Sequence, residues 1–194
     1  NILECCRYLK IKNLIFASSS SIYGLNKNFP LKEKDSANHP IQLYAATKKS
    51  NEVMAHAYSY LFNIPSTCLR FFTVYGPWGR PDMALFNFTR NILNNKKINV
   101  FNHGNHARDF TYIDDVVSVI DQFIKKPAKS NRSWNYKNPD PSTSVAPFRI
   151  FNVSNGSKIS LINFIKEIEK KLKKKAKINF LPLQKGDVLE TISS

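Results

Sequence analysis

The amino-acid sequence predicts an α/β fold whose strands form a mostly parallel sheet. Short apolar runs at residues 13–18 and 66–74 are typical of buried strands, and each is followed by a polar or Gly-containing turn. Between them, residues 43–62 follow a helical period and contain neither Gly nor Pro. Because strands and helices alternate in this way, parallel pairing is expected, and ligands of such sheets bind at the carboxyl ends of the strands.

The same patterns assign the remaining elements in chain order. The chain opens, without Met, in a helical pattern around Ile2, Leu3 and Cys6, so we interpret it as a fragment of a longer protein. A polar loop with Pro30 and Pro40 separates the first strand from the long helix. Later helices are expected at 84–94, 112–126 and 161–174, later strands at 98–101, 149–153 and 177–183, and a long mobile loop at 127–147.

Length and composition are those of a globular protein. The chain has 194 residues, of which 42% are hydrophobic, enough for one large domain or two small ones. No apolar run approaches the roughly 20 residues of a membrane helix, and no signal-peptide pattern opens the chain. The three cysteines, Cys5, Cys6 and Cys68, form no C-x-x-C motif, which favours a reducing cytoplasm. The four histidines show no metal-ligand spacing, so no metal is expected.

The formal net charge of +15 raises a nucleic-acid hypothesis. Much of the charge lies in a lysine run that ends the expected 161–174 helix, whose apolar stripe is Leu161, Ile165, Ile168 and Leu172. Solvation and the helix dipole account for lysines on the outer face and in the last turn of such a helix. Since no nucleic-acid motif accompanies them, nucleic acid is not expected as a partner. The positive potential would instead help to attract an anionic small substrate.

A Tyr and a Lys four residues apart carry the most specific chemical signal. Tyr44 and Lys48 share one face of the expected 43–62 helix, which brings the ammonium close to the phenol. A nearby ammonium favours the phenolate, so Tyr44 is a candidate base at neutral pH. A serine from the run at 18–21, at the end of the preceding strand, is placed to hold a substrate hydroxyl beside it.

Together with these elements, further motifs make the chain resemble an extended short-chain dehydrogenase/reductase of the NAD-dependent epimerase/dehydratase family. The motifs that match, in order, are the serine element ending in Tyr23-Gly24, the Tyr44–Lys48 pair, R-F-F-T-V-Y-G at 70–76 and R-D-F-T-Y-I-D-D at 108–115. Within the family, the stretches most similar to UDP-glucuronate 4-epimerases are 70–84, 138–149 and 179–191. The family's Gly-rich cofactor fingerprint has no counterpart in this sequence.

The resemblance implies a partial, doubly wound, Rossmann-type dinucleotide-binding domain with a smaller C-terminal α/β substrate domain. Residues 1–78 would form the C-terminal part of the NAD-binding domain. Residues 79–194 would form mainly the nucleotide-sugar-binding domain, with the helix at 112–126 and the strand at 149–153 returning to the NAD domain.

The activity that the resemblance implies is 4-epimerisation of UDP-glucuronate to UDP-galacturonate with bound NAD, through a transient 4-keto sugar. Tyr44 would take the proton from the sugar C4 hydroxyl and Lys48 would hold the nicotinamide ribose, so both would also bind the cofactor. Ser19 would hydrogen-bond the reacting oxygen, and Phe71 would pack near the nicotinamide.

A uronate substrate makes a further demand, because oxidation at C4 produces a β-keto acid that readily loses its C5 carboxylate. Ser20 and Ser21, either of which could take the role of Ser19, stand where related dehydratases carry an acid pair and related decarboxylases a Glu. Hydroxyls are poor acids and bases near neutral pH, which disfavours both reactions. Thr73 and Arg80 match positions expected to hold the carboxylate, which guanidinium can grip with two parallel hydrogen bonds.

The remaining substrate contacts are also implied by the resemblance. Arg108 matches a diphosphate-binding arginine, Phe101 would stack on uracil, and Gln184 and Asp187 match positions that meet the uridine ribose or phosphate. The acidic pair at 114–115 is interpreted instead as first-turn residues favoured by the helix dipole.

Two alternatives remain open. The chain could come from an epimerase for a neutral UDP-hexose or another nucleotide-sugar enzyme, or it could be an inactive, truncated nucleotide-sugar binder. Relatives often form homodimers through two helices packed as a four-helix bundle, and the 43–62 helix would be one of them. The expected location is the cytoplasm, without a membrane partner, and the expected product would feed polysaccharide biosynthesis.

Overall fold

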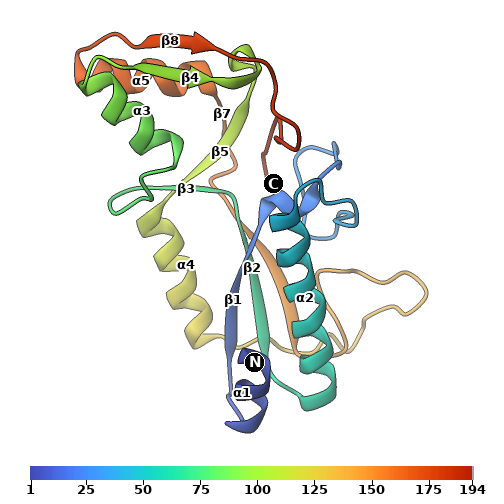
Figure 1. Ribbon diagram of the computed structural model, residues 1–194. Coiled ribbons are helices and arrows are strands. Elements are labelled where there is room, and N and C mark those ends of the chain that lie inside the picture. The colour runs from blue at the N-terminus through green and yellow to red at the C-terminus, as the bar shows by residue number, and fades with distance from the viewer. Residues whose placement is uncertain (194) are drawn as a thin grey trace.

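A parallel three-stranded sheet forms the base of the structure, a computed structural model that describes residues 1–193 (Figure 1). The strand order is β1 (Leu14–Ser19), β2 (Ser66–Phe71) and β6 (Phe148–Val153). In register, Ser18 lies beside Arg70, and Arg70 lies beside Asn152. The carboxyl ends of all three strands therefore meet at one edge, as the predicted α/β fold requires.

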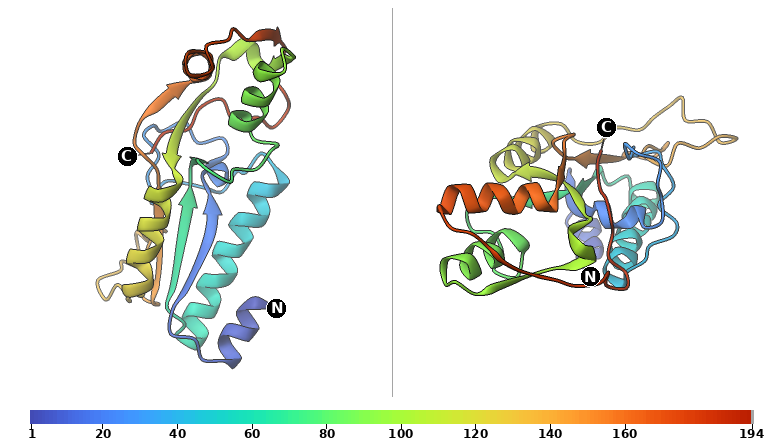
Figure 2. Two further views of the ribbon diagram at one scale, coloured as in Figure 1. Left: turned by 90° about the vertical axis from the view of Figure 1, so that its left-hand side faces the viewer. Right: turned by 90° about the horizontal axis from the view of Figure 1, so that it is seen from above.

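Helices cover both faces of this sheet (Figure 2, left). The helix α2 (Leu43–Phe62) has the predicted bounds and packs through Ala55 against Cys68. On the opposite face, α4 (Ile113–Lys125) packs through Val116 against Leu69. Successive β2 side chains alternate between the two faces, so even-numbered residues of β2 face α2 and odd-numbered residues face α4. A short helix, α1 (Ile2–Tyr8), precedes β1 and contacts α2.

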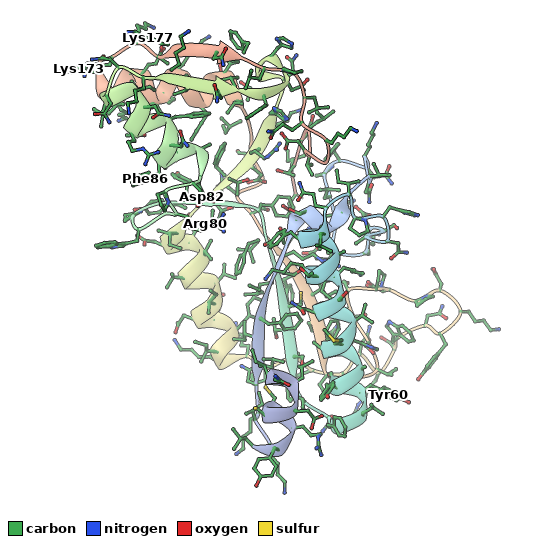
Figure 3. All side chains as sticks on the ribbon, in the orientation of Figure 1. Tyr60, Arg80, Asp82, Phe86, Lys173 and Lys177 are labelled. Atoms are coloured by element: carbon green, nitrogen blue, oxygen red, sulfur yellow. The ribbon has the colours of Figure 1, made fainter. Side chains whose placement is uncertain are left out.

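A second lobe is built on a two-stranded parallel sheet (Figure 1). Its elements are β4 (Lys97–Val100), β8 (Lys177–Phe180), α3 (Ala84–Leu93) and α5 (Leu161–Leu172). The predicted apolar stripe of α5 is confirmed, because Ile165 and Ile168 are buried in the core with Ile92 and Ile98 of α3 and β4. Lys173 and Lys177 lie at the outer end of this lobe (Figure 3).

The single strand predicted at 66–74 is wrong, because the chain changes sheets at Phe72. Its N–H donates to the carbonyl of Val153 (3.1 Å), and its side chain is buried with Ile22 and Tyr23. The chain continues as β3 (Thr73–Tyr75) in a sheet with β5 (Ala107–Tyr112) and β7 (Lys158–Ser160). The pair β3–β5 is parallel and β5–β7 antiparallel, so this sheet, which joins the two lobes, is mixed.

The other predicted elements are present with bounds shifted at one or both ends. The predicted strands 13–18, 98–101 and 149–153 are displaced by one residue at one or both ends, whereas the strand 177–183 ends three residues earlier, at Phe180. The helices predicted at 84–94, 112–126 and 161–174 are shorter by one or two residues. Residues 127–147 contain no helix or strand. The middle of this segment extends away from the body (Figure 1), whereas Ala128, Ser144 and Ala146 near its ends are buried.

Two further observations concern the cysteines and the hydrophobicity of the helices. The three cysteines are free thiols, and only Cys5 is exposed. Within residues 1–193, no helix is both long enough and apolar enough to cross a membrane.

Candidate functional site

The serine run lies at the carboxyl edge of the base sheet. Ser19 ends β1 and caps the short helix η1 (Ser20–Tyr23). Its Oγ accepts a hydrogen bond from the Ser21 N–H (3.2 Å) and donates to the Ser21 Oγ (3.1 Å). This local bonding orders the serine hydroxyls at the position where ligands of parallel sheets bind.

Tyr44 and Lys48 lie at the same edge, in the first turns of α2. The Lys48 Nζ donates to the carbonyl of Ala17 in β1 (3.1 Å) and lies 5.8 Å from the centroid of the Tyr44 ring. Tyr44 is 52% exposed, so its phenol is open to a ligand. The two side chains share a helix face, as positions four residues apart should.

A cavity of about 1280 Å³ opens at this edge and brings many of the predicted residues together. The predicted residues that line it are Ser19, Ser20, Ser21, Tyr44, Thr73 and Arg80. The cavity continues along α3, where Phe86, Thr89, Arg90 and Leu93 form its wall. Sequence reasoning did not select these residues, although the strongly amphipathic helix directly after Arg80 was a usable signal.

Arg80 holds a carboxylate of its own loop (Figure 3). Its Nε and Nη2 donate to the two oxygens of Asp82, at 3.2 and 2.8 Å. Both side chains are largely exposed, so the pair contributes little to stability. The Asp82 pair shows that this guanidinium can hold a carboxylate through two hydrogen bonds, both of which Asp82 occupies here.

Arg108 and Asp187 form a second cluster outside the cavity. The Arg108 Nη2 lies 3.3 Å from Asp187, and burial lowers the pKa of Arg108 while the Asp187 charge opposes that shift. The His106 Nε2 lies 3.0 Å from the other Asp187 oxygen, in a contact whose geometry is not that of a hydrogen bond. The loop that carries Asp187 is fastened to the base by a hydrogen bond from Gln42 to the carbonyl of Gly186 (2.6 Å).

Other predicted site residues do not line the cavity. Phe71 faces α4 with Leu69, and the next residue, Phe72, lines the cavity in its place. Phe101 begins the short helix η2 (Phe101–Gly104), and Gln184 is exposed in the loop after β8. The acidic pair at 114–115 lies in the first turn of α4, as expected. Within residues 1–193, no group of His, Cys, Asp and Glu side chains is placed to hold a metal ion.

Sequence reasoning also missed a buried ion pair beneath the site. Glu52 of α2 accepts two hydrogen bonds from Arg70 of β2, both 2.9 Å long, and both side chains are almost fully buried. Burial raises the pKa of Glu52, but the hydrogen bonds and charge of Arg70 outweigh it and leave that pKa below its usual value. A Glu four residues after Lys48 was the only sequence signal.

Comparisons with known proteins show the family of the chain. Residues 1–136 match the NAD dependent epimerase/dehydratase family. The chain is 56% identical over its full length to "Protein CapI" of Staphylococcus aureus and 47% identical to the "Probable UDP-glucuronate 4-epimerase" of Rhizobium meliloti (strain 1021). It is also similar, with 31% identity and a TM-score of 0.79, to the crystal structure of UDP-glucuronic acid 4-epimerase from Bacillus cereus in complex with UDP-glucuronic acid and NAD.

These matches cover all of this chain but only part of each relative. The chain spans 58% of the Staphylococcus aureus protein, 57% of the Rhizobium meliloti protein and 56% of the Bacillus cereus chain.

Proposed function

Because this chain belongs to the NAD dependent epimerase/dehydratase family, we propose that the complete protein interconverts UDP-glucuronate and UDP-galacturonate by epimerisation at C4. The observation that carries the proposal is the cavity that Tyr44 and the serine run share with Thr73 and Arg80. A base, hydroxyls that can orient a sugar, and a guanidinium for a carboxylate are the groups that this reaction needs.

The residues beside β1 fit NAD. The Lys48 ammonium uses one N–H on the carbonyl of Ala17, which leaves two donors for the hydroxyls of a nicotinamide ribose. Tyr44 lies next to it at the carboxyl edge of a parallel sheet, the usual position for a dinucleotide. When bound, NAD supplies a hydride acceptor and donor for the sugar C4. Phe71 is proposed to pack near the nicotinamide.

Tyr44 is proposed to carry out the proton transfers. Its hydroxyl oxygen, acting as the base, takes the proton of the C4 hydroxyl and later returns a proton to the inverted oxygen. Ser19 donates a hydrogen bond to that oxygen and keeps it within reach of the phenol. Between the two proton transfers, the 4-keto sugar rotates within the site, so that its opposite face receives the hydride.

The uronate carboxylate is held by Arg80 and Thr73, with Ser20 and Ser21 beside them. A carboxylate in such a grip is oriented so that carbon dioxide loss from the 4-keto stage is discouraged. Arg108 is proposed to bind the diphosphate. Phe101, Gln184 and Asp187 are proposed to meet the uridine, which assigns residues 79–194 mainly to the nucleotide sugar and residues 1–78 to NAD.

The test is to incubate the complete protein with UDP-glucuronate and follow the sugar by proton NMR. The proposal predicts a mixture of UDP-glucuronate and UDP-galacturonate without added NAD, because the cofactor is retained. A UDP-pentose product would mean decarboxylation and would contradict the role given to Thr73 and Arg80. No reaction with the uronate but conversion of UDP-glucose would make the protein a neutral-sugar epimerase.

One observation supports that second candidate. The guanidinium of Arg80 is engaged by Asp82, so its two donors are not free for a substrate carboxylate unless Asp82 moves. An epimerase for a neutral UDP-hexose would not need them. The two candidates differ in their expected response to loss of Arg80.

A homodimer in the cytoplasm is also proposed. The outer surface of α2 exposes Val53, Met54, Tyr60 and Leu61, each about half exposed or more. Apolar side chains gathered on one helix are typical of a surface that pairs with another copy. Sedimentation of the complete protein at twice the monomer mass would support the dimer, and a monomer at all concentrations would exclude it.

A further inference from the structure

The largest fully buried side chain of residues 1–193 belongs to Arg70, which the proposed chemistry does not use. Besides its two hydrogen bonds to Glu52, its Nη1 donates to the hydroxyl of Tyr23 (2.9 Å) and to the carbonyl of Glu33 (3.1 Å). The guanidinium thus has partners in three directions, each from a different part of the chain.

Two of these partners belong to the elements that carry the proposed reacting groups. Glu52 lies four residues after Lys48 and eight after Tyr44, so it extends the same face of α2 down to the sheet. Tyr23 is the last residue of η1, the turn that begins with Ser20. Arg70 therefore bridges the turn of the serines and the helix of the Tyr–Lys pair from beneath.

Tyr23 is itself fixed from several sides. Its hydroxyl donates to the Asn152 Oδ1 (2.7 Å) in β6, and its ring lies 4.9 Å from the guanidinium carbon of Arg70. Asn152 in turn donates to the carbonyl of Leu31 (3.1 Å) in the loop after η1. A turn held by so many directional bonds has little freedom to shift relative to β2.

Stability alone is a weak reason for such an arrangement. A buried ion pair can often be replaced by apolar residues of similar volume without loss of stability, because desolvation of the two charges offsets their attraction. What apolar packing does not supply is the fixed direction and length of two parallel hydrogen bonds.

We propose that Arg70, with Glu52 and Tyr23, is a positioning unit that sets the separation between the serine hydroxyls of η1 and the phenol of Tyr44. It touches neither sugar nor cofactor and acts only through the elements it joins. The effect of that separation on catalysis rests on the proposed function. The contacts of Arg70 with Glu52 and Tyr23 do not depend on that function.

The test uses Tyr23→Phe in the complete protein, which removes one hydroxyl and keeps the ring over Arg70. A small displacement of reacting groups can cost about a hundredfold in rate, so we expect kcat to fall by about ten- to a hundredfold. KM for the UDP-sugar should stay within about twofold, since no binding contact is removed. Glu52→Asp, which keeps the charge but shortens the arm, should lower kcat in the same way.

The matched control is Tyr58→Phe. Tyr58 lies on α2, the helix that also carries Glu52, and the substitution likewise removes one hydrogen-bonded hydroxyl, which here donates to Glu4, far from the serines. The kcat of Tyr58→Phe should equal that of the wild type. The proposal is overturned if kcat is unchanged in Tyr23→Phe, or if the control loses as much.

Crystal structures of wild type and Tyr23→Phe separate this proposal from the proposed function. We expect η1 to shift relative to α2, with a changed distance between the Ser21 Oγ of η1 and the Tyr44 hydroxyl. An unchanged distance overturns the positioning unit even if kcat falls. If the wild type converts no UDP-sugar, the reaction was assigned wrongly, and the distance alone decides the positioning unit.

Discussion

Lys48 is anchored to the strand that ends in the serines and lies beside Tyr44 at the same time. Its Nζ donates to the carbonyl of Ala17 (3.1 Å) and stands 5.8 Å from the centroid of the Tyr44 ring. One side chain thus links the position of the proposed base to the end of β1. Because the link is to backbone, no other side chain is needed to keep the ammonium in place.

The first prediction is that Tyr44→Phe abolishes most of the turnover. Loss of a general base typically lowers the rate by about 10²- to 10⁴-fold, so kcat for UDP-glucuronate should fall by that amount. Stability should change little, because the ring is half exposed. NMR of the sugar gives kcat, and thermal unfolding gives stability. Tyr60→Phe, an exposed Tyr at the far end of the same helix (Figure 3), should keep full activity, and equal loss in both variants would contradict the assignment.

The second prediction distinguishes a uronate substrate from a neutral one. Arg80→Ala should lower kcat/KM for UDP-glucuronate by about 10- to 100-fold, since a hydrogen bond to a charged group contributes about 1.5–3 kcal/mol. Turnover of UDP-glucose, if any, should be nearly unchanged. Both are measured by the same NMR assay.

Asp82→Asn is the control for Arg80→Ala. It releases the exposed ion pair while Arg80 remains, so uronate turnover should be retained or improved. If Arg80→Ala reduced turnover of both sugars equally, Arg80 would not be a carboxylate ligand, and the neutral-sugar candidate would gain.

Much of the fold was predictable because local patterns and global structure agree. The bounds of α2 follow from an uninterrupted helical period, and the stripe with Ile165 and Ile168 correctly identified the buried face of α5. The serine run, Tyr44 and Arg80 converge on one cavity because the carboxyl ends of parallel strands share an edge.

What sequence reasoning missed depends on long-range contacts. The strand β5 carries Arg108 and Asp109, charged residues that are typical of loops. Asp109 is nevertheless fully buried, because its carboxylate accepts hydrogen bonds from the backbone N–H groups of Asn155 (2.9 Å) and Gly156 (3.0 Å). The break at Phe72 is equally hidden, since its bond to Val153 joins residues far apart in the sequence.

The third prediction concerns acid stability and the Glu52–Arg70 pair. Arg70 holds the pKa of Glu52 below the usual 4.5, so the unfolded state binds a proton before the folded state does. The stability that this provides is fully present above pH 4.5 and is lost as pH falls through the folded pKa. Urea unfolding should therefore show a falling free energy of unfolding below about pH 5.

In Glu52→Gln, the free energy of unfolding at pH 7 should drop by about 3–5 kcal/mol, because a buried guanidinium is left without its counter-charge. The acid-dependent loss should also be smaller than in the wild type. Glu4→Gln, at an exposed pair with Arg7, is the control and should leave the free energy of unfolding nearly unchanged. If the free energy of unfolding of Glu52→Gln fell with decreasing pH as steeply as that of the wild type, a group other than Glu52 would account for the loss of stability in acid.

The fourth prediction concerns His56, which joins α2 to the segment before β6. Its ring lies edge-on to Phe148, with centroids 5.1 Å apart, and its Nε2 lies 2.8 Å from the Oγ of buried Ser144. Burial holds the pKa of His56 below the usual 6.5, so the neutral ring is the form that the fold accommodates. The unfolded chain therefore takes up the proton first as pH falls.

It follows that the stability contributed by neutral His56 is present above pH 6.5 and declines as pH falls from there to the folded pKa. His56→Gln cannot titrate but can still hydrogen-bond Ser144, so its free energy of unfolding should lose the part of the pH dependence between about pH 7 and pH 5 that the wild type shows. The exposed His39, replaced by Gln, should leave that dependence intact. Urea unfolding at a series of pH values measures all three proteins, and identical curves for His56→Gln and the wild type would mean that burial of this ring does not affect folding.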